Sequence, residues 1–243
     1  MTFTYWYAVI SHATGAGALP NSWGPGLYDL PLRCVVQGEL AGVVSDWLGK
    51  PVSRSSDSVD PVLVVRHEQV VEQIMDDVAV LPMRFGTILH GDEGVQAMLA
   101  ERQATLKADL AHVAGCVELG VRVLWEPPAP VTPAPEPAPL PTPVTTPGAQ
   151  YMLRRAAEEQ TRRAGQAHGQ ALAAELDRTL RSHAIDARLT VLQTERLLLS
   201  AAYLVRHEQT PAFETAVEGL RAAYAQLAFL CSGPWPPYHF VSA

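Results

Sequence analysis

The sequence has few of the residues and motifs that build metal, disulfide or nucleotide sites. It holds three cysteines in 243 residues, and Cys34, Cys116 and Cys231 lie too far apart for the paired spacing of a zinc site. It also lacks the P-loop signature, the glycine fingerprint of a dinucleotide-binding turn and the nucleophile elbow of a hydrolase. These absences argue against the common catalytic sites, and we expect no cofactor and no metal.

Positive charge and long apolar runs are also scarce. The 18 Lys and Arg residues are outnumbered by 25 Asp and Glu residues, which gives a formal net charge of −7. A nucleic-acid partner requires a basic surface, so this balance argues against one. No apolar run approaches the roughly 18 residues of a membrane-spanning helix, and the N-terminus has no signal-peptide pattern. We therefore expect a cytoplasmic protein with no nucleic-acid and no membrane partner.

Proline is concentrated in one segment. Half of the 20 prolines lie between Pro127 and Pro147, where charge is nearly absent. Such a composition favours polyproline II over helix or sheet. The sequence therefore predicts an N-terminal domain at 1–126, a proline-rich linker at 127–148 and a C-terminal domain at 149–243.

The first part of the chain alternates between strand and helix patterns. Aromatic and β-branched residues predict a strand at 3–10, and two extended runs around Gly38-Glu39 predict a hairpin. Asp60-Pro61 is a typical helix start. The expected order continues with a strand at 78–85, a helix from Asp92 to Gly115 and a last strand at 116–125. We interpret this part as an α+β fold, a ferredoxin-like sandwich with an inserted or rearranged strand.

The second part is predicted as an α+β domain with a long helix. Residues 149–183 are rich in Ala, Glu, Arg and Leu without proline, which favours one helix. Strands are expected at 184–192 and 197–205, a helix from Pro211, and short strands at 229–231 and 238–241. The helix from Pro211 has a heptad-like stripe and is expected to pack against the long helix and the sheet. The pentapeptide VRHEQ occurs at both 65–69 and 205–209, which we interpret as chance.

No set of side chains forms a convincing catalytic constellation. His67-Glu68 begins like a metalloprotease helix, but Val71 occupies the position of the second imidazole. The other histidines have no ligand spacing, and the carboxylate pairs are adjacent residues that point apart on a helix. We expect a protein that is not an enzyme.

Two stretches are more distinctive than the composition requires. They are residues 80–87 (VLPMRFGT) and residues 232–241 (SGPWPPYHFV), and they accompany YWYAV at 5–9 and VELGVRV at 117–123. Together these motifs resemble the GvpL/GvpF family of gas vesicle proteins. The resemblance covers nearly the whole chain outside the linker and a glycine-rich loop near residue 15, and the linker is unusually proline-rich for the family.

The resemblance implies a two-domain α+β protein, with a ferredoxin-like first domain and a second domain that holds the long helix in a coiled-coil-like pair. It also implies a role in gas vesicle assembly or nucleation. It implies contact with the small hydrophobic shell protein GvpA and with other gas vesicle accessory proteins, without cofactor or enzymatic activity. The protein would be cytoplasmic and associated with the vesicle, where it could also be a minor component. A sheet edge could accept a shell strand, or a groove could accept an amphipathic shell helix.

Six residues of the two distinctive motifs are candidates for partner binding: Arg84, Phe85, Gly86, Thr87, Trp235 and Tyr238. Each motif also has a purely structural interpretation. Arg84 could form an internal ion pair while Gly86 supplies a special backbone angle. The aromatic corner could instead be a rigid plug that closes the second domain.

Two other functions remain open from the sequence. A ferredoxin-like enzyme would need polar groups that converge in a pocket, and Tyr5, Tyr7, His67 and Arg84 are the best available set. A self-associating module would use the long alanine-rich helix at 149–183, and its dimers would vanish when that helix is deleted.

Overall fold

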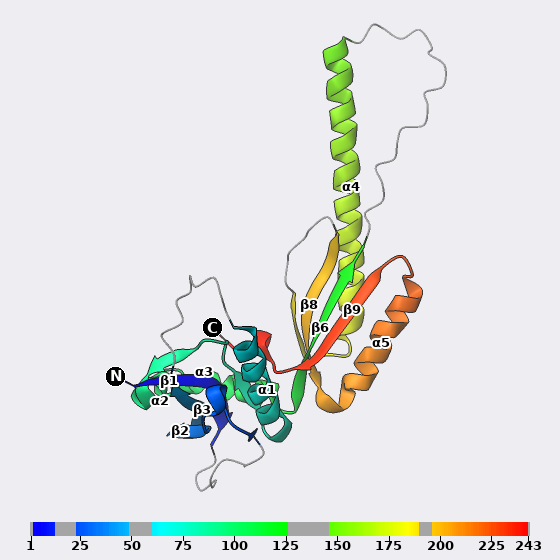
Figure 1. Cartoon of the computed structure of the whole chain (residues 1–243). Helices are drawn as coiled ribbons and strands as arrows, with labels where there is room; N and C mark the ends of the chain where they lie inside the picture. Colours follow the sequence, from blue (N-terminus) through cyan, green and yellow to red (C-terminus); the bar gives the residue numbers. More distant parts are fainter. Residues whose placement is uncertain (1, 13–22, 49–59, 126–145, 190–195, 243) are drawn as a thin grey trace.

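Two antiparallel sheets organise the chain (Figure 1). The computed structural model describes residues 2–12, 23–48, 60–125, 146–189 and 196–242. The predicted linker at 127–148 lies outside the described residues except for its last three positions. The division into domains at 1–126, 127–148 and 149–243 therefore stays a prediction.

The first half of the chain builds a sheet with helices on both faces. Its elements are β1 (Phe3–Ser11), η2 (Leu27–Asp29), β2 (Arg33–Gln37), β3 (Leu40–Trp47), α1 (Pro61–Asp77), β4 (Val80–Pro82), β5 (Ile88–His90), α2 (Gly91–Glu101) and α3 (Gln103–Val113). The strand order is β2-β3-β1-β4, with β5 also paired to β1. Tyr5 and Tyr7 pack in a cluster with α1, whereas Trp6 packs in a cluster with α2 and α3. Because β1 is covered on both faces, seven of its nine residues are buried in one run.

Local signals in the sequence explain the boundaries of these elements. Gly38, in the predicted hairpin between β2 and β3, has a φ of 60°, which glycine adopts without strain. The Asp60 side chain accepts a hydrogen bond from the Val62 N–H and caps α1, with Pro61 in the first turn. The predicted helix between Asp92 and Gly115 is interrupted at Arg102, so it forms α2 and α3.

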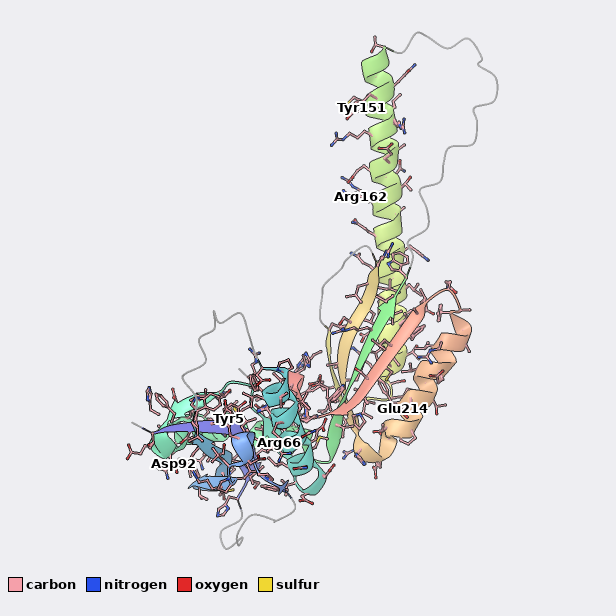
Figure 2. All side chains as sticks on the ribbon, in the orientation of Figure 1. Tyr5, Arg66, Asp92, Tyr151, Arg162 and Glu214 are labelled. Atoms are coloured by element: carbon pink, nitrogen blue, oxygen red, sulfur yellow. The ribbon has the colours of Figure 1, made fainter. Side chains whose placement is uncertain are left out.

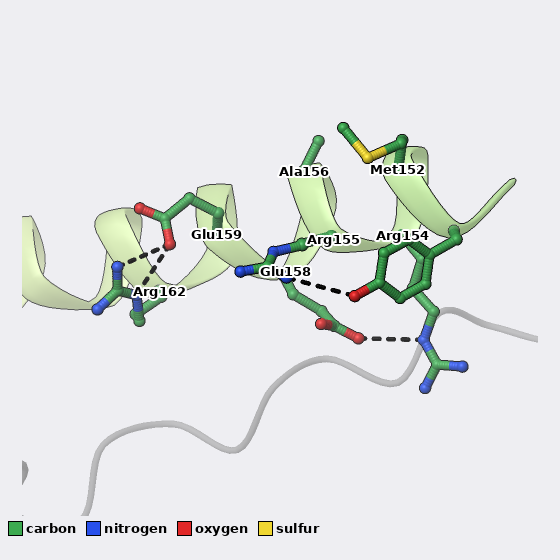
Figure 3. A pocket seen from close by; sticks show the side chains of 8 residues that line it. Met152, Arg154, Arg155, Ala156, Glu158, Glu159 and Arg162 are labelled. Carbon is green, nitrogen blue, oxygen red and sulfur yellow. Dashed lines mark hydrogen bonds and ion pairs between the residues drawn. The ribbon is translucent and has the colours of Figure 1, made fainter. Parts of the chain in front are cut away.

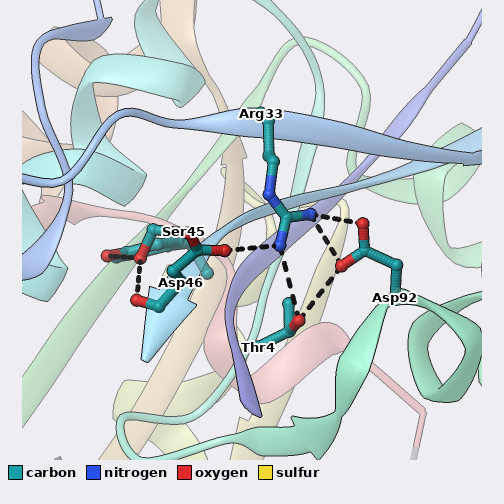
Figure 4. Close-up of polar contacts among 6 residues, drawn as sticks. Thr4, Arg33, Ser45, Asp46 and Asp92 are labelled. Atoms are coloured by element: carbon teal, nitrogen blue, oxygen red, sulfur yellow. Dashed lines mark hydrogen bonds and ion pairs between the residues drawn. The ribbon is translucent and has the colours of Figure 1, made fainter. Parts of the chain in front are cut away.

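A network of charged and polar groups joins β1, β2 and β3 to the start of α2 (Figure 4). The Arg33 guanidinium bonds to Asp92 at 2.7 Å and to Asp46 at 2.9 Å, and Thr4 donates to Asp92 at 3.0 Å. Asp92 lies in the first turn of α2, where the helix dipole favours a carboxylate. These contacts fix α2 against the ends of three strands.

The second half builds a sheet with both of its helices on one face. Its elements are β6 (Cys116–Leu124), α4 (Pro147–Arg181), β7 (Asp186–Leu189), β8 (Leu197–Arg206), η3 (His207–Gln209), α5 (Thr210–Ala223), β9 (Ala228–Trp235) and η4 (Tyr238–Phe240). The strand order is β7-β8-β6-β9. Leucines of α4 and Phe213 of α5 pack in one cluster with Val121 and Tyr203 of the sheet.

The strand β6 corrects the sequence-based fold. It was expected to close the first sheet, but it pairs with β8 and β9 and lies inside the second sheet. The β-α-β-β-α-β order of a ferredoxin-like sandwich is therefore found in the elements from β6 to β9 and not in residues 1–126. The pattern of β6 correctly indicated a strand but carried no information about its neighbours.

Helix α4 is longer than the sheet that it covers. Leu176 and Leu180 are buried, whereas Tyr151, Met152 and Leu153 are 60–64% exposed. Figure 2 shows Tyr151 and Arg162 on the part of α4 that projects beyond the sheet. Ion pairs within the helix, such as Arg154–Glu158 at 3.0 Å, support this projecting part (Figure 3). The pairing of α4 with α5 is therefore limited to the C-terminal part of α4. None of the described helices is both long and apolar enough to cross a membrane.

The end of the chain returns to the first half. Strand β9 continues through Pro234 to Trp235, and residues 238–240 form a 3₁₀ turn where a strand was predicted. Phe240 is 3% exposed and packs in a cluster that includes Trp6 and Leu81 of the first sheet and Leu204 of the second. The aromatic corner thus closes the contact between the two sheets and not the second sheet alone.

A buried carboxylate attaches α4 to the second sheet. Asp177 is 9% exposed, accepts a hydrogen bond from the Tyr203 hydroxyl at 2.9 Å, and pairs with Arg181 at 2.7 Å. Replacing Tyr203 with phenylalanine should lower the free energy of unfolding by about 1–3 kcal/mol, because Asp177 loses a partner where water cannot replace it. Urea unfolding would measure this. Tyr224→Phe is the control, because its bond to Glu175 is exposed, and we expect a change below about 0.5 kcal/mol. Equal effects of the two substitutions would contradict the prediction.

Candidate functional site

The two distinctive motifs meet at the side chain of His67. His67 lies on α1 and is 0% exposed. Its Nε2 atom is 3.0 Å from the Met83 carbonyl of the first motif and 3.3 Å from the Tyr238 hydroxyl of the second. Segments more than 150 residues apart in the sequence are therefore joined through one imidazole. We call His67, Met83 and Tyr238 the His67 junction.

The hydrogen bonds at His67 determine its tautomer, and its burial determines its charge. A carbonyl oxygen can only accept, so Nε2 carries the hydrogen and donates to Met83. Nδ1 then accepts from the Tyr5 hydroxyl at 3.0 Å, and that hydroxyl in turn accepts from the Gly86 N–H at 3.0 Å. Burial lowers the pKa of His67 to about 4, although the bond to Met83 acts in the opposite direction. His67 is therefore a neutral connector at physiological pH.

Tyr7 stacks on the His67 ring and forms a second buried hydrogen-bond group. Its hydroxyl accepts from the Leu27 N–H at 2.7 Å and lies 2.9 Å from the Ser45 hydroxyl. Ser45 in turn bonds to the Asp46 carbonyl. Burial raises the pKa values of Tyr5 and Tyr7, so both stay protonated donors.

Tyr238 attaches the C-terminal segment to α1. Its hydroxyl donates to Glu68 at 3.0 Å. Burial, followed by the charge of Glu68, raises the pKa of Tyr238. Beside it, the backbone N–H of His239 donates to Glu118 at 2.9 Å, and the imidazole of His239 contacts the same carboxylate at 2.6 Å. Glu118 is 5% exposed, so these contacts satisfy a buried charge between the sheets.

The four candidates of the first motif form the turn between β4 and β5. Gly86 has a φ of 84°, a backbone angle that favours glycine, and Thr87 bonds to the Arg84 carbonyl. The Phe85 ring packs against Tyr5 and His67. Arg84 is exposed and has no ion pair among the described residues, so the internal ion pair considered for it is not found.

The two aromatic candidates of the second motif differ in their surroundings. Tyr238 is half-buried, and its hydroxyl is used inside the junction. Trp235 is 42% exposed at the end of β9. It precedes Tyr238 by three residues, so the two Cα atoms are at most about 11 Å apart. Arg84 and Trp235 are therefore the two large exposed side chains among the six candidates.

The set proposed for an enzyme is brought together only in part. The rings of Tyr5, Tyr7 and His67 pack on one another at centroid distances of 4.8–5.7 Å, and their polar atoms bond within the network. Arg84 points to solvent and does not join them. Within the described residues, no cluster of three or more His, Cys, Asp or Glu side chains could hold a metal ion. This arrangement is a packed structural core and not a group of polar atoms facing a shared space.

Sequence reasoning missed the central role of His67. It was considered as a metal ligand and as part of an enzyme pocket, although the apolar residues Val70, Val71 and Ile74 mark its face of α1 as buried. His67 precedes Val70 and Val71 by one turn and Ile74 by two, which could have indicated a buried histidine. Its partners could not be found in this way, because they lie on remote segments.

Comparison with known proteins agrees with this geometry. The family described as "Gas vesicle synthesis protein GvpL/GvpF" matches residues 3–242, from the start of β1 to just beyond η4. The chain belongs to the GvpL/GvpF family. Membership gives it a role in gas vesicles and places it among their structural and accessory proteins.

Individual relatives support the same assignment. The chain is 30% identical to gas vesicle protein F of Streptomyces sp. (strain CB03234), covering 99% of both chains. It is 28% identical to gas vesicle protein F2 of Halobacterium salinarum over 83% of this chain and 76% of that one. The crystal structure of GvpF from Anabaena sp. PCC7120 has a TM-score of 0.78 over 100% of this chain and 97% of the other. At 18% identity, that likeness shows the fold alone.

Proposed function

We propose that this protein acts in the cytoplasm in gas vesicle assembly or nucleation by binding the shell protein GvpA. The family match over residues 3–242 carries the proposal, because it includes both motifs that form the His67 junction. Contact with other accessory proteins and retention as a minor vesicle component belong to the same proposal.

We propose that Arg84 and Trp235 are the main shell contacts. Arginine and tryptophan are enriched at the energetic centres of protein interfaces. Both residues are exposed beside a buried hydrogen-bond network, which holds their backbone before a partner arrives. Phe85, Gly86, Thr87 and Tyr238 would then position these two side chains and contribute little contact themselves.

The double variant Arg84→Ala/Trp235→Ala should capture GvpA at least about tenfold less tightly than the original chain. The experiment is co-expression with GvpA followed by pull-down and titration of the soluble complex. The control is Arg155→Ala/Tyr151→Ala, which removes an exposed arginine and an exposed aromatic ring from the projecting part of α4. Unchanged capture by the first variant would refute these contact residues. Failure of the original chain to bind soluble GvpA would refute direct shell binding.

A further inference from the structure

The second sheet has one face that its own helices do not cover. Val121 and Val123 of β6 point into the cluster with α4 and α5, so Arg122 and Leu124 point to the opposite face. The register places Arg122 beside Ser200 of β8 and Leu230 of β9. We call the following residues the open face: Gly120, Arg122, Leu124, Ser200, Leu230 and Ser232.

Among the described residues, those of the first half cover only the neighbouring part of this side of the sheet. Cys116, Ala202 and Leu204 pack in the cluster with the first half and Phe240. Beyond them, Leu124 is 47% and Leu230 57% exposed, and Arg122 is exposed between them. A sheet face of this kind is normally buried against another element.

The open face combines a shallow centre with apolar borders. Gly120, Ser200 and Ser232 are small and leave room above the strands, whereas Leu124 and Leu230 stand beside them. Arg122 lies among these residues and has no ion pair among the described residues. A partner that covers this face must therefore offer both apolar contact and negative charge.

The edges of the same sheet are less suited to a partner strand. The carbonyl of Phe229 on the edge strand β9 is occupied by Arg221 at 3.0 Å, and Pro234 has no N–H to donate. The other edge strand, β7, has only four residues. These features favour contact through the face.

We propose that the open face binds an amphipathic helix of a partner protein, with its apolar side on Leu124 and Leu230 and a carboxylate opposite Arg122. A second copy of this chain fits less well. Face-to-face contact around a two-fold axis would bring Arg122 toward its own symmetry mate, and paired like charges are unfavourable. The proposal uses neither Arg84 nor Trp235, although Trp235 ends the same strand β9, so it does not depend on shell binding through those two side chains.

Site-specific photo-crosslinking of the full chain tests the proposal in cells that produce gas vesicles. p-Benzoylphenylalanine replaces Leu230 on the open face. In the control it replaces Leu189, which is 47% exposed on the helix-covered side of the sheet. We expect an adduct from position 230 only. The crosslinked partner peptide should have apolar residues at helical spacing and an Asp or Glu within one turn of the attachment point.

The charge of Arg122 provides the second arm of the experiment. Arg122→Glu should reduce the adduct at least tenfold, whereas Arg122→Lys should retain most of it. Unchanged thermal unfolding would show that both variants stay folded. An adduct with another copy of this chain, an adduct insensitive to Arg122→Glu, or no adduct in vesicle-forming cells would each overturn the proposal.

Discussion

Replacing Phe240 with alanine is expected to lower the free energy of unfolding by about 3–5 kcal/mol. Phe240 is 3% exposed, and its cluster contains residues of both sheets, including Leu81 and Leu204. The guanidinium of Arg188 also lies over the ring, 5.6 Å from its centre. The substitution therefore removes packing from both halves of the molecule at once.

Equilibrium denaturation followed by tryptophan fluorescence measures this loss, because Trp6 is buried in the same cluster. Tyr151→Ala provides the control, since that aromatic side chain is 60% exposed on the projecting part of α4 and should matter by less than about 0.5 kcal/mol. A loss below about 1 kcal/mol for Phe240→Ala would mean that the C-terminal segment is not an integral part of the core.

Local sequence signals predicted an element well where neighbouring residues alone determine it. The start of α1 follows from Asp60 and Pro61, and the hairpin between β2 and β3 follows from Gly38. The break at Arg102 was missed because Leu99 and Leu106 lie on either side of it and are both buried. Periodicity therefore continues across the break, and nothing in the apolar pattern marks the end of α2.

Pairing between strands depends on information that periodicity does not carry. Strand β6 was predicted nearly to the residue, yet its sheet was wrong, because alternation specifies a face and not a neighbour. Strand β9 was expected to end at Cys231, before a run of prolines. It continues through Pro234, since an edge strand has one side on which a missing N–H breaks no ladder bond.

The candidate site, too, could be predicted from the sequence only in part. The two motifs were recognised from the sequence, but their meeting at His67 depends on the fold. The structure also separates the six candidates by exposure, because Tyr238 and Phe85 are committed to internal contacts while Arg84 and Trp235 face solvent. Exposure is a tertiary property, and the motifs alone could not supply it.

The stability of the protein should fall as the pH is lowered from about 6.5 to about 4, in part because of His67. Its pKa is about 4 in the folded state against an ordinary value of 6.5. Above pH 6.5 the imidazole is neutral in both states and favours neither. Below it, the unfolded chain binds a proton that the folded chain excludes, so folding loses up to on the order of 3 kcal/mol by pH 4. Burial raises the pKa of Glu68, which acts in the opposite direction over the acid range.

The contribution of His67 can be isolated by comparing pH profiles of unfolding free energy for the original chain and His67→Gln. Glutamine keeps a donor and an acceptor for Met83 and Tyr5 but has no titration, and Glu68 remains in both proteins. The variant should therefore lose less stability between pH 6.5 and pH 4, even if it is less stable at neutral pH. His207→Gln is a matched control, because it makes the same substitution in the second VRHEQ pentapeptide, where the histidine is exposed. Parallel profiles for the original chain and His67→Gln would show that His67 accepts a proton in the folded state at its ordinary pKa, and the neutral junction would then be wrong.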